Sequence, residues 1–146
     1  MTSSAASGRS GFAGYGLNRQ VGYVFGVVYL LVGLLGFFVK SNGFAATDGG
    51  KLLGIFMVNP LHNIVHLAAG ALLVYGASRG EAMSRNVNIL VGGIYLVVGI
   101  IGLFILSSSA NILALNAADN GLHFVSAVLL LGVGLAGSRG TVRTRI

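Results

Sequence analysis

Cysteine is absent from this chain and acidic residues are scarce, and both facts narrow what it can do. Without cysteine there is no disulfide, no thiolate metal site and no cysteine nucleophile. The only acids, Asp48, Glu81 and Asp119, lie outside the middle of the long apolar stretches. A proton-coupled carrier usually needs an acidic side chain at mid-membrane. Because serine elbows, phosphate-binding glycine loops, paired carboxylates and the HExxH pattern are also missing, we expect no enzyme.

Apolar residues fill most of the chain. It is 55% hydrophobic and 8% charged, which is not the balance of a soluble domain. Two stretches, Val21–Val39 and Val87–Leu106, carry no charge and are long enough to cross a hydrocarbon core of about 30 Å. Two shorter stretches, Leu61–Ala77 and Gly121–Gly137, lack acids, lysine and arginine. We predict one domain over residues 18–138, with transmembrane helices at about 19–39, 59–77, 86–107 and 119–137.

An internal repeat organises these helices. Asn18–Val39 aligns without a gap on Ser84–Ile105, and Asn59–His62 aligns on Asn120–His123. Identical residues in register include three glycines and a tyrosine, which fall on one helical face: Gly26, Tyr29, Gly33 and Gly36, with Gly92, Tyr95, Gly99 and Gly102. Small residues let membrane helices approach closely, so we expect this face to pack. The sequence predicts an all-α integral membrane four-helix bundle built from two parallel two-helix hairpin repeats.

Basic residues indicate the orientation of the bundle. Seven arginines fall on one side of the predicted helices and two lysines, Lys40 and Lys51, on the other. Positive residues in short loops favour the cytoplasmic side, so both termini are expected there. We expect residues 1–17 to be a disordered cytoplasmic tail and residues 139–146 a basic one. The net charge of +6 then reflects membrane anchoring, and no nucleic-acid partner is expected.

The single proline indicates where the second helix begins. Proline lacks an amide hydrogen and suits the first helical position, so Asn59 is the expected N-cap and Pro60 the first residue. Asp119 or Asn120 is expected to cap the fourth helix. The preceding apolar run, Leu52–Val58, has three possible placements. It can extend the second helix, lie in the interface, or form a buried plug between helices.

The three histidines are the candidates for site chemistry. His62 and His123 occupy aligned positions, and His66 follows His62 by one helical turn. One hypothesis is a structural polar cluster in which the imidazoles pair with neighbouring amides and a carboxylate near the outer membrane face: Asn59, His62, Asn63, His66, Asp119, Asn120 and His123. The alternative is a haem- or metal-binding site formed by His62, His66 and His123, because neutral imidazole ligates zinc, copper and iron.

Two segments carry a resemblance to a known family. They are Val58-Asn59-Pro60-Leu61-His62-Asn63-Ile64-Val65-His66 and Asp119-Asn120-Gly121-Leu122-His123. The chain resembles a bacterial family of small four-helix membrane proteins catalogued as a domain of unknown function. The resemblance covers about residues 18–138 and implies four membrane helices in a bacterial inner membrane. It implies no activity.

These observations together predict a structural or accessory multi-pass protein of the inner membrane. Its expected partners are the lipid bilayer and either a second membrane protein or further copies of itself. No resident cofactor is expected under this interpretation. Haem or a divalent metal belongs to the alternative that uses the three histidines.

Overall fold

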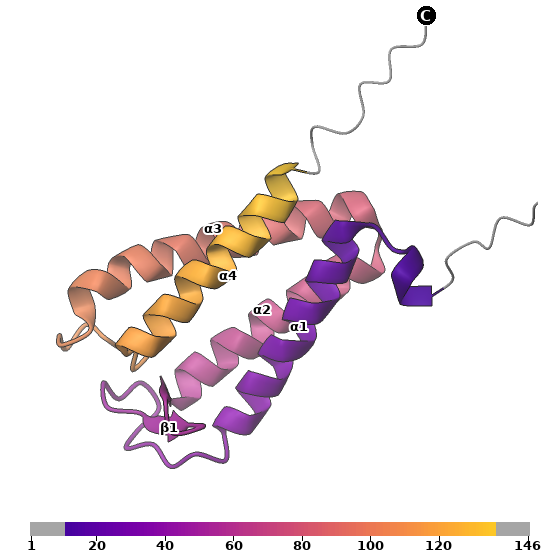
Figure 1. Cartoon of the computed structure of the whole chain (residues 1–146). Coiled ribbons are helices and arrows are strands. Elements are labelled where there is room, and N and C mark those ends of the chain that lie inside the picture. The colour runs from indigo at the N-terminus through magenta and orange to yellow at the C-terminus, as the bar shows by residue number, and fades with distance from the viewer. Residues whose placement is uncertain (1–10, 137–146) are drawn as a thin grey trace, which may run out of the picture.

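The computed structural model describes residues 11–136, and Figure 1 shows their arrangement. In chain order the elements are η1 (Gly11–Gly14), α1 (Leu17–Gly36), β1 (Gly50–Leu52), β2 (Phe56–Val58), α2 (Pro60–Ser78), α3 (Glu81–Ile105) and α4 (Ala117–Ala136). Residues 1–10 of the predicted N-terminal tail (residues 1–17) and the whole predicted C-terminal tail (residues 139–146) lie outside the described residues. The expected N-terminal tail is too long, however, because Gly11–Gly14 forms a short 3-10 helix.

All four α-helices are long and apolar enough to span a membrane. Over residues 11–136 the chain is therefore a multi-pass membrane protein with four helices, and the predicted all-α four-helix bundle is confirmed apart from the small β-hairpin. Its origin in two hairpin repeats stays a prediction. Both ends of the described chain lie at one end of the bundle, called here the termini end (Figure 1). The strands and the α3–α4 connection lie at the opposite end, called here the hairpin end.

The helix bounds differ from the predicted ones by up to five residues. Helix α1 ends at Gly36, where Phe37 and Phe38 close i to i−3 turns onto Leu34 and Leu35. Helix α3 begins at Glu81, five residues earlier than predicted, because Gly80 turns the chain with a φ of 118°. Only glycine adopts such a φ readily, and it shortens the α2–α3 connection to two residues. Arg85 consequently lies within α3 and not in a loop.

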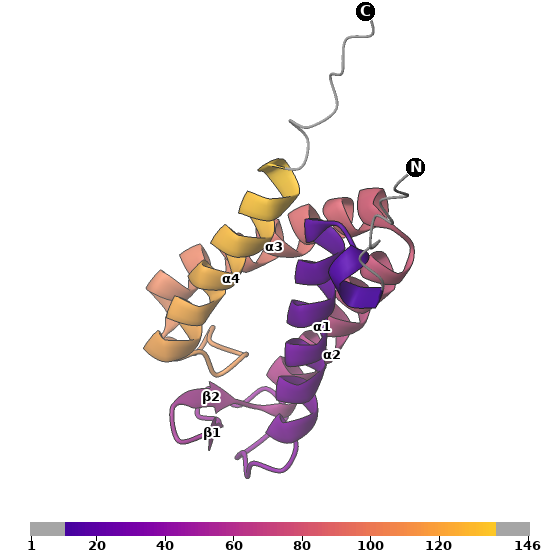
Figure 2. The same cartoon turned by 45° about the vertical axis from the view of Figure 1, so that its right-hand side comes forward.

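The helices associate as two antiparallel pairs, α1 with α2 and α3 with α4 (Figure 2). The predicted glycine faces are buried in both α1 and α3. At Gly26 an added Cβ would lie 3.0 Å from the carbonyl oxygen of Gly70, and at Gly70 one would lie 2.8 Å from that of Gly26. The two backbones therefore touch at this crossing, as small-residue packing in membranes requires.

Two tyrosines join the pairs at the centre of the bundle. The rings of Tyr29 from α1 and Tyr95 from α3 stack with centroids 5.0 Å apart. They belong to the buried core together with Leu73, Val87, Val91, Ala127 and Leu130. Stacked aromatic rings contribute dispersion and electrostatic attraction beyond their buried area. The tyrosine face expected from the repeat thus forms the contact between α1 and α3.

The apolar run before Pro60 forms an antiparallel hairpin, in which Gly50 pairs with Val58 and Leu52 with Phe56. Of the three placements left open for this run, extension of helix α2 is excluded, because Pro60 begins the helix and Asn59 caps it. Leu52 and Val58 are buried, while Leu53 and Ile55 at the turn are 78% and 56% exposed. The hairpin closes the hairpin end of the bundle (Figure 1).

Candidate metal site

The N-terminus of α2 positions two of the histidines. The Asn59 side chain accepts a hydrogen bond of 2.8 Å from the His62 amide, so the predicted N-cap is confirmed. Pro60 then sets the helical geometry of the first turn. With the helix started in this register, His62 and His66 share one face, and both are buried against α3 and α4.

The N-terminus of α4 positions the third histidine. Asn116 caps this helix by accepting from the Asp119 amide at 2.9 Å, and the Asp119 carboxylate accepts from the Asn116 amide at 3.0 Å. This reciprocal arrangement is a capping box. The expectation that Asp119 or Asn120 caps the helix is therefore wrong. The Asn-x-x-Asp spacing was the signal that could have placed the cap at Asn116. With its cap at Asn116, helix α4 starts in a register that places His123 in the interior of the bundle.

The three imidazoles converge inside the bundle. His62 Nε2 and His66 Nε2 lie 3.0 Å apart. The three residues each offer one ring nitrogen, and these nitrogens all lie within 4.8 Å of one another. The side chains of His62, His66 and His123 are 1%, 5% and 4% exposed. Residues separated by about 60 positions in sequence therefore form one buried cluster, called here the histidine triad.

A cavity of about 30 Å³ lies among these rings and is lined by all three histidines, Tyr95 and apolar side chains. That volume matches the share of one water molecule in the liquid. A single ion with one additional ligand is of this size. Haem is not, because its four-ring macrocycle is many times larger than the space of one water molecule. The haem alternative therefore does not fit this arrangement.

Not every ring nitrogen of the triad makes a hydrogen bond within the protein. The Tyr95 hydroxyl and His66 Nδ1 lie 3.2 Å apart, so His66 has partners at both nitrogens. The Nδ1 atoms of His62 and His123 are buried without a hydrogen bond. Among residues 11–136, no hydrogen bond ends on the His123 ring. Buried polar atoms are normally paired. The His62 ring has the backbone of Met57 and Leu113 beside it, whereas the His123 ring has no such neighbour, so His123 is the imidazole open to a ligand.

Donor chemistry decides which ions suit such a site. Neutral imidazole nitrogen favours zinc, copper, iron and nickel over magnesium or calcium, which prefer oxygen. With Zn–N bonds of about 2.0–2.1 Å, two nitrogens of a tetrahedral site lie about 3.3 Å apart. The separation of His62 and His66 is already close to that value. A modest movement of the His123 ring would complete three ligands.

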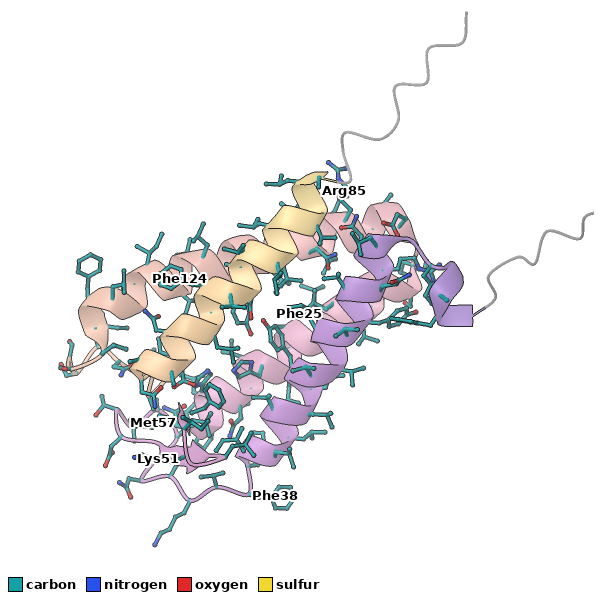
Figure 3. The ribbon with its side chains drawn as sticks, in the orientation of Figure 1. Phe25, Phe38, Lys51, Met57, Arg85 and Phe124 are labelled. Atoms are coloured by element: carbon teal, nitrogen blue, oxygen red, sulfur yellow. The ribbon has the colours of Figure 1, made fainter. Side chains whose placement is uncertain are left out.

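The remaining residues of the predicted polar cluster serve other contacts. Asn59 donates to the carbonyl oxygens of Ala46 and Ile112 at 2.9 and 2.8 Å. Asp119 accepts from the Met57 amide at 3.1 Å and so holds strand β2. Within the described residues none of these side chains bonds to an imidazole ring. They fasten the loops at the hairpin end around the triad, and Figure 3 shows Met57 and Lys51 at that end.

Asn63 and Asn120 make equivalent contacts, each with a glycine of the neighbouring helix. Asn63 lies against Gly36, and Asn120 lies against Gly102, so closely that a Cβ at either glycine would overlap the amide. Their Oδ1 atoms are buried without a hydrogen bond. These two side chains fill the glycine positions of α1 and α3. They belong to helix packing and do not reach the ring nitrogens.

A second polar cluster, at the termini end, was missed by sequence reasoning. The Glu81 carboxylate accepts from the backbone and side-chain amides of Asn18, and Ser84 donates to the Asn18 carbonyl at 2.7 Å. Asn88 donates to the same carbonyl at 3.0 Å. Ser84 and Asn88 lie one turn apart on α3, and that spacing of polar residues in an apolar helix was the available signal. The cluster joins α1 to α3.

Comparison with known proteins gives a family. A family model described as a domain of unknown function, DUF4383, matches residues 19–136. The chain belongs to the DUF4383 family. The match spans the four helices and includes the entire histidine triad. No curated protein and no solved structure matches the chain. DUF4383 membership thus agrees with the resemblance seen in the sequence, and the site chemistry must be argued from the triad itself.

Proposed function

We propose that this DUF4383 protein is a membrane protein that binds one transition-metal ion through His62, His66 and His123. One observation carries the proposal, which is the convergence of three buried ring nitrogens within 4.8 Å around a cavity large enough for a single ion. Imidazole clusters that serve only as structure satisfy their nitrogens through protein hydrogen bonds. Here the buried Nδ1 atom of His123 has none.

The proposed role is binding, without catalysis. A catalytic zinc site keeps an open position and usually has a nearby acid or base that handles protons. The nearest carboxylate, Asp119, is engaged by the amides of Met57 and Asn116. A metal held by the triad would also link α2 to α4, and so join the two helix pairs. The proposal therefore retains the accessory, non-enzymatic role expected from the sequence.

We also propose that the protein lies in a bacterial inner membrane with both termini in the cytoplasm. Arg19, Arg79 and Arg85 lie at the termini end, whereas Lys40 and Lys51 belong to the loop and strand at the hairpin end. This asymmetry supports the orientation through the positive-inside rule. The triad would then lie beneath the outer surface, under the β-hairpin.

The metal proposal is tested on full-length protein purified in detergent, stripped with EDTA and titrated with Zn²⁺ and Co²⁺. We expect one ion per chain and, for Co²⁺, the intense visible bands of tetrahedral coordination. His123→Phe keeps the aromatic contacts of the ring and removes the ligand, so it should abolish the bands.

The matched control is Asn88→Ser, which changes a buried polar residue at the termini end. It should retain one ion per chain. Absence of stoichiometric binding by folded wild-type protein overturns the proposal. Binding that survives His123→Phe overturns the assignment of this residue as a ligand.

A further inference from the structure

A groove of about 160 Å³ lies between α1 and α4, distinct from the cavity inside the triad. Its rim carries Val24, Val28 and Leu122, which are 52%, 46% and 40% exposed. Figure 3 shows Phe25, another lining residue, in the space between these two helices. In a membrane this rim faces acyl chains. The groove therefore opens to the bilayer.

The floor of the groove is polar and buried. It consists of Tyr29, His66 and Ser126, which are 3%, 5% and 1% exposed. The Ser126 and Tyr95 side chains lie beside the Tyr29 hydroxyl, but neither reaches it with the distance and angle of a hydrogen bond. A buried hydroxyl without a partner costs free energy, and the cost is greatest in hydrocarbon, where no water replaces the partner.

The aligned tyrosine, Tyr95, differs from Tyr29 in the partner of its hydroxyl and in the size of the space beside it. Val28, Tyr29 and Val32 line the α1–α4 groove, and their aligned residues Ile94, Tyr95 and Val98 line the triad cavity. There the tyrosine hydroxyl has His66 Nδ1 at 3.2 Å, and the space is only about 30 Å³. The unpartnered hydroxyl of Tyr29 thus coincides with the larger space.

We propose that this groove binds a neutral, lipid-soluble molecule that carries a carbonyl group on its head. The phenol of Tyr29 donates a hydrogen bond to that carbonyl, with the Ser126 hydroxyl beside it as a second donor. The apolar tail leaves between Val28 and Leu122 into the bilayer. A neutral head is required because no carboxylate, lysine or arginine lines the groove, and an unpaired charge at this depth is costly.

The groove and the triad share His66 but bind different chemistry. The carbonyl ligand needs a hydrogen-bond donor, which Tyr29 supplies, whereas the metal needs ring nitrogens. The groove proposal therefore does not depend on the metal. Carrying out the binding experiment in EDTA keeps the two proposals separate, and failure of one leaves the other intact.

The experiment compares three probes with the same ten-carbon tail on full-length protein in detergent with EDTA. They are decyl-1,4-benzoquinone with two carbonyls, decylbenzene with none, and decyl phosphate with a charged head. Binding is measured by calorimetry and by the shift in melting temperature. We expect decylbenzoquinone to bind one per chain, at least tenfold more tightly than either other probe.

Two variants and a control complete the test. Tyr29→Phe removes only the unpartnered hydroxyl, so it should fold normally and weaken decylbenzoquinone binding three- to tenfold. Val28→Trp fills the exposed rim without entering the core and should abolish binding. Tyr75→Phe removes the hydroxyl of a tyrosine that is 54% exposed on α2 and should leave binding unchanged. Equal affinity for decylbenzene, preference for decyl phosphate, or unchanged affinity in Tyr29→Phe overturns the proposal.

Discussion

His62 Nε2 and His66 Nε2 face each other at 3.0 Å, and their rings stack with centroids 4.7 Å apart. Two protonated imidazoles would repel at this distance, so the pair is neutral or shares one proton. One nitrogen then donates to the other, so the two Nε2 atoms satisfy each other without a ligand. The proposed metal ion would replace that single hydrogen bond with two coordinate bonds.

Tyr95 supports the proposed metal site from outside the ligand set. Its hydroxyl fixes His66 through Nδ1 at 3.2 Å, and partners of this kind orient a ligand and raise its basicity. We expect Tyr95→Phe to lower the affinity for Zn²⁺ by about 10- to 100-fold. Competition with a chromogenic chelator measures the change. Tyr29→Phe is the matched control and should leave the affinity unchanged, since Tyr29 makes no hydrogen bond to a triad nitrogen.

Asn59 caps helix α2 and also holds two neighbouring loops through hydrogen bonds to their carbonyl groups. Asn59→Ala removes the cap of α2 and two hydrogen bonds to loop carbonyls, and should lower the free energy of unfolding by about 2–4 kcal/mol. Asn59→Ser keeps a capping oxygen but lacks the amide donors, so it should lose less. Unfolding in a mixed-micelle denaturant series distinguishes the two. Equal losses would show that the cap contributes little.

Two adjacent glycines on α3 should respond oppositely to alanine. At Gly92 an added Cβ would lie 2.9 Å from the Leu131 amide nitrogen and 3.0 Å from the Leu130 Cβ. Gly92→Ala should therefore push α3 from α4 and destabilise by about 1–3 kcal/mol. At Gly93 nothing lies within 4 Å, and Gly93→Ala should be neutral or stabilise by up to about 1 kcal/mol. Melting temperatures in detergent measure both. A clear loss of stability in Gly93→Ala would contradict the orientation of α3, in which Gly93 has no neighbour within 4 Å.

Asp119 should control the opening of the β-hairpin. Its carboxylate oxygen accepts from the Met57 and Asn116 amides. We expect Asp119→Ala to speed amide hydrogen exchange at Met57 by about tenfold or more, because each hydrogen bond contributes about 1 kcal/mol and the cap is lost as well. Asp119→Asn retains an accepting oxygen, so exchange should change little. If Asn accelerates exchange as much as Ala, the charge of the carboxylate matters more than its position.

The proposed orientation predicts where reporters function. A fluorescent protein fused after Ile146 should fold in the cytoplasm, and alkaline phosphatase inserted at Gly43 should be active in the periplasm. Periplasmic activity of a C-terminal phosphatase fusion would reverse the assignment. The triad would then lie beneath the cytoplasmic face.

Local signals predicted much of the candidate site. The Asn59–Pro60 start followed from the chemistry of the two residues, and the burial of Tyr29 and Tyr95 followed from the glycine spacing. The β-hairpin was not predicted, because an apolar run of seven residues has no unique period. The pairing of imidazoles with Asn63 or Asn120 was expected across the bundle, because buried polar groups in a membrane should face inward and pair. The structure instead places these amides against glycines of the neighbouring helix.

The amino-acid sequence alone determined the four membrane helices, the buried glycine faces and the three candidate histidines, because hydropathy and helical period are properties of short segments. Only the tertiary structure decided that His123 from α4 meets His62 and His66 from α2, and that Tyr95 supports His66. The physical reason is that these contacts depend on the relative depth and rotation of two helix pairs. Close backbone packing and the hydrogen bonds across the hairpin end set both quantities, and neither is encoded by the spacing within any one helix.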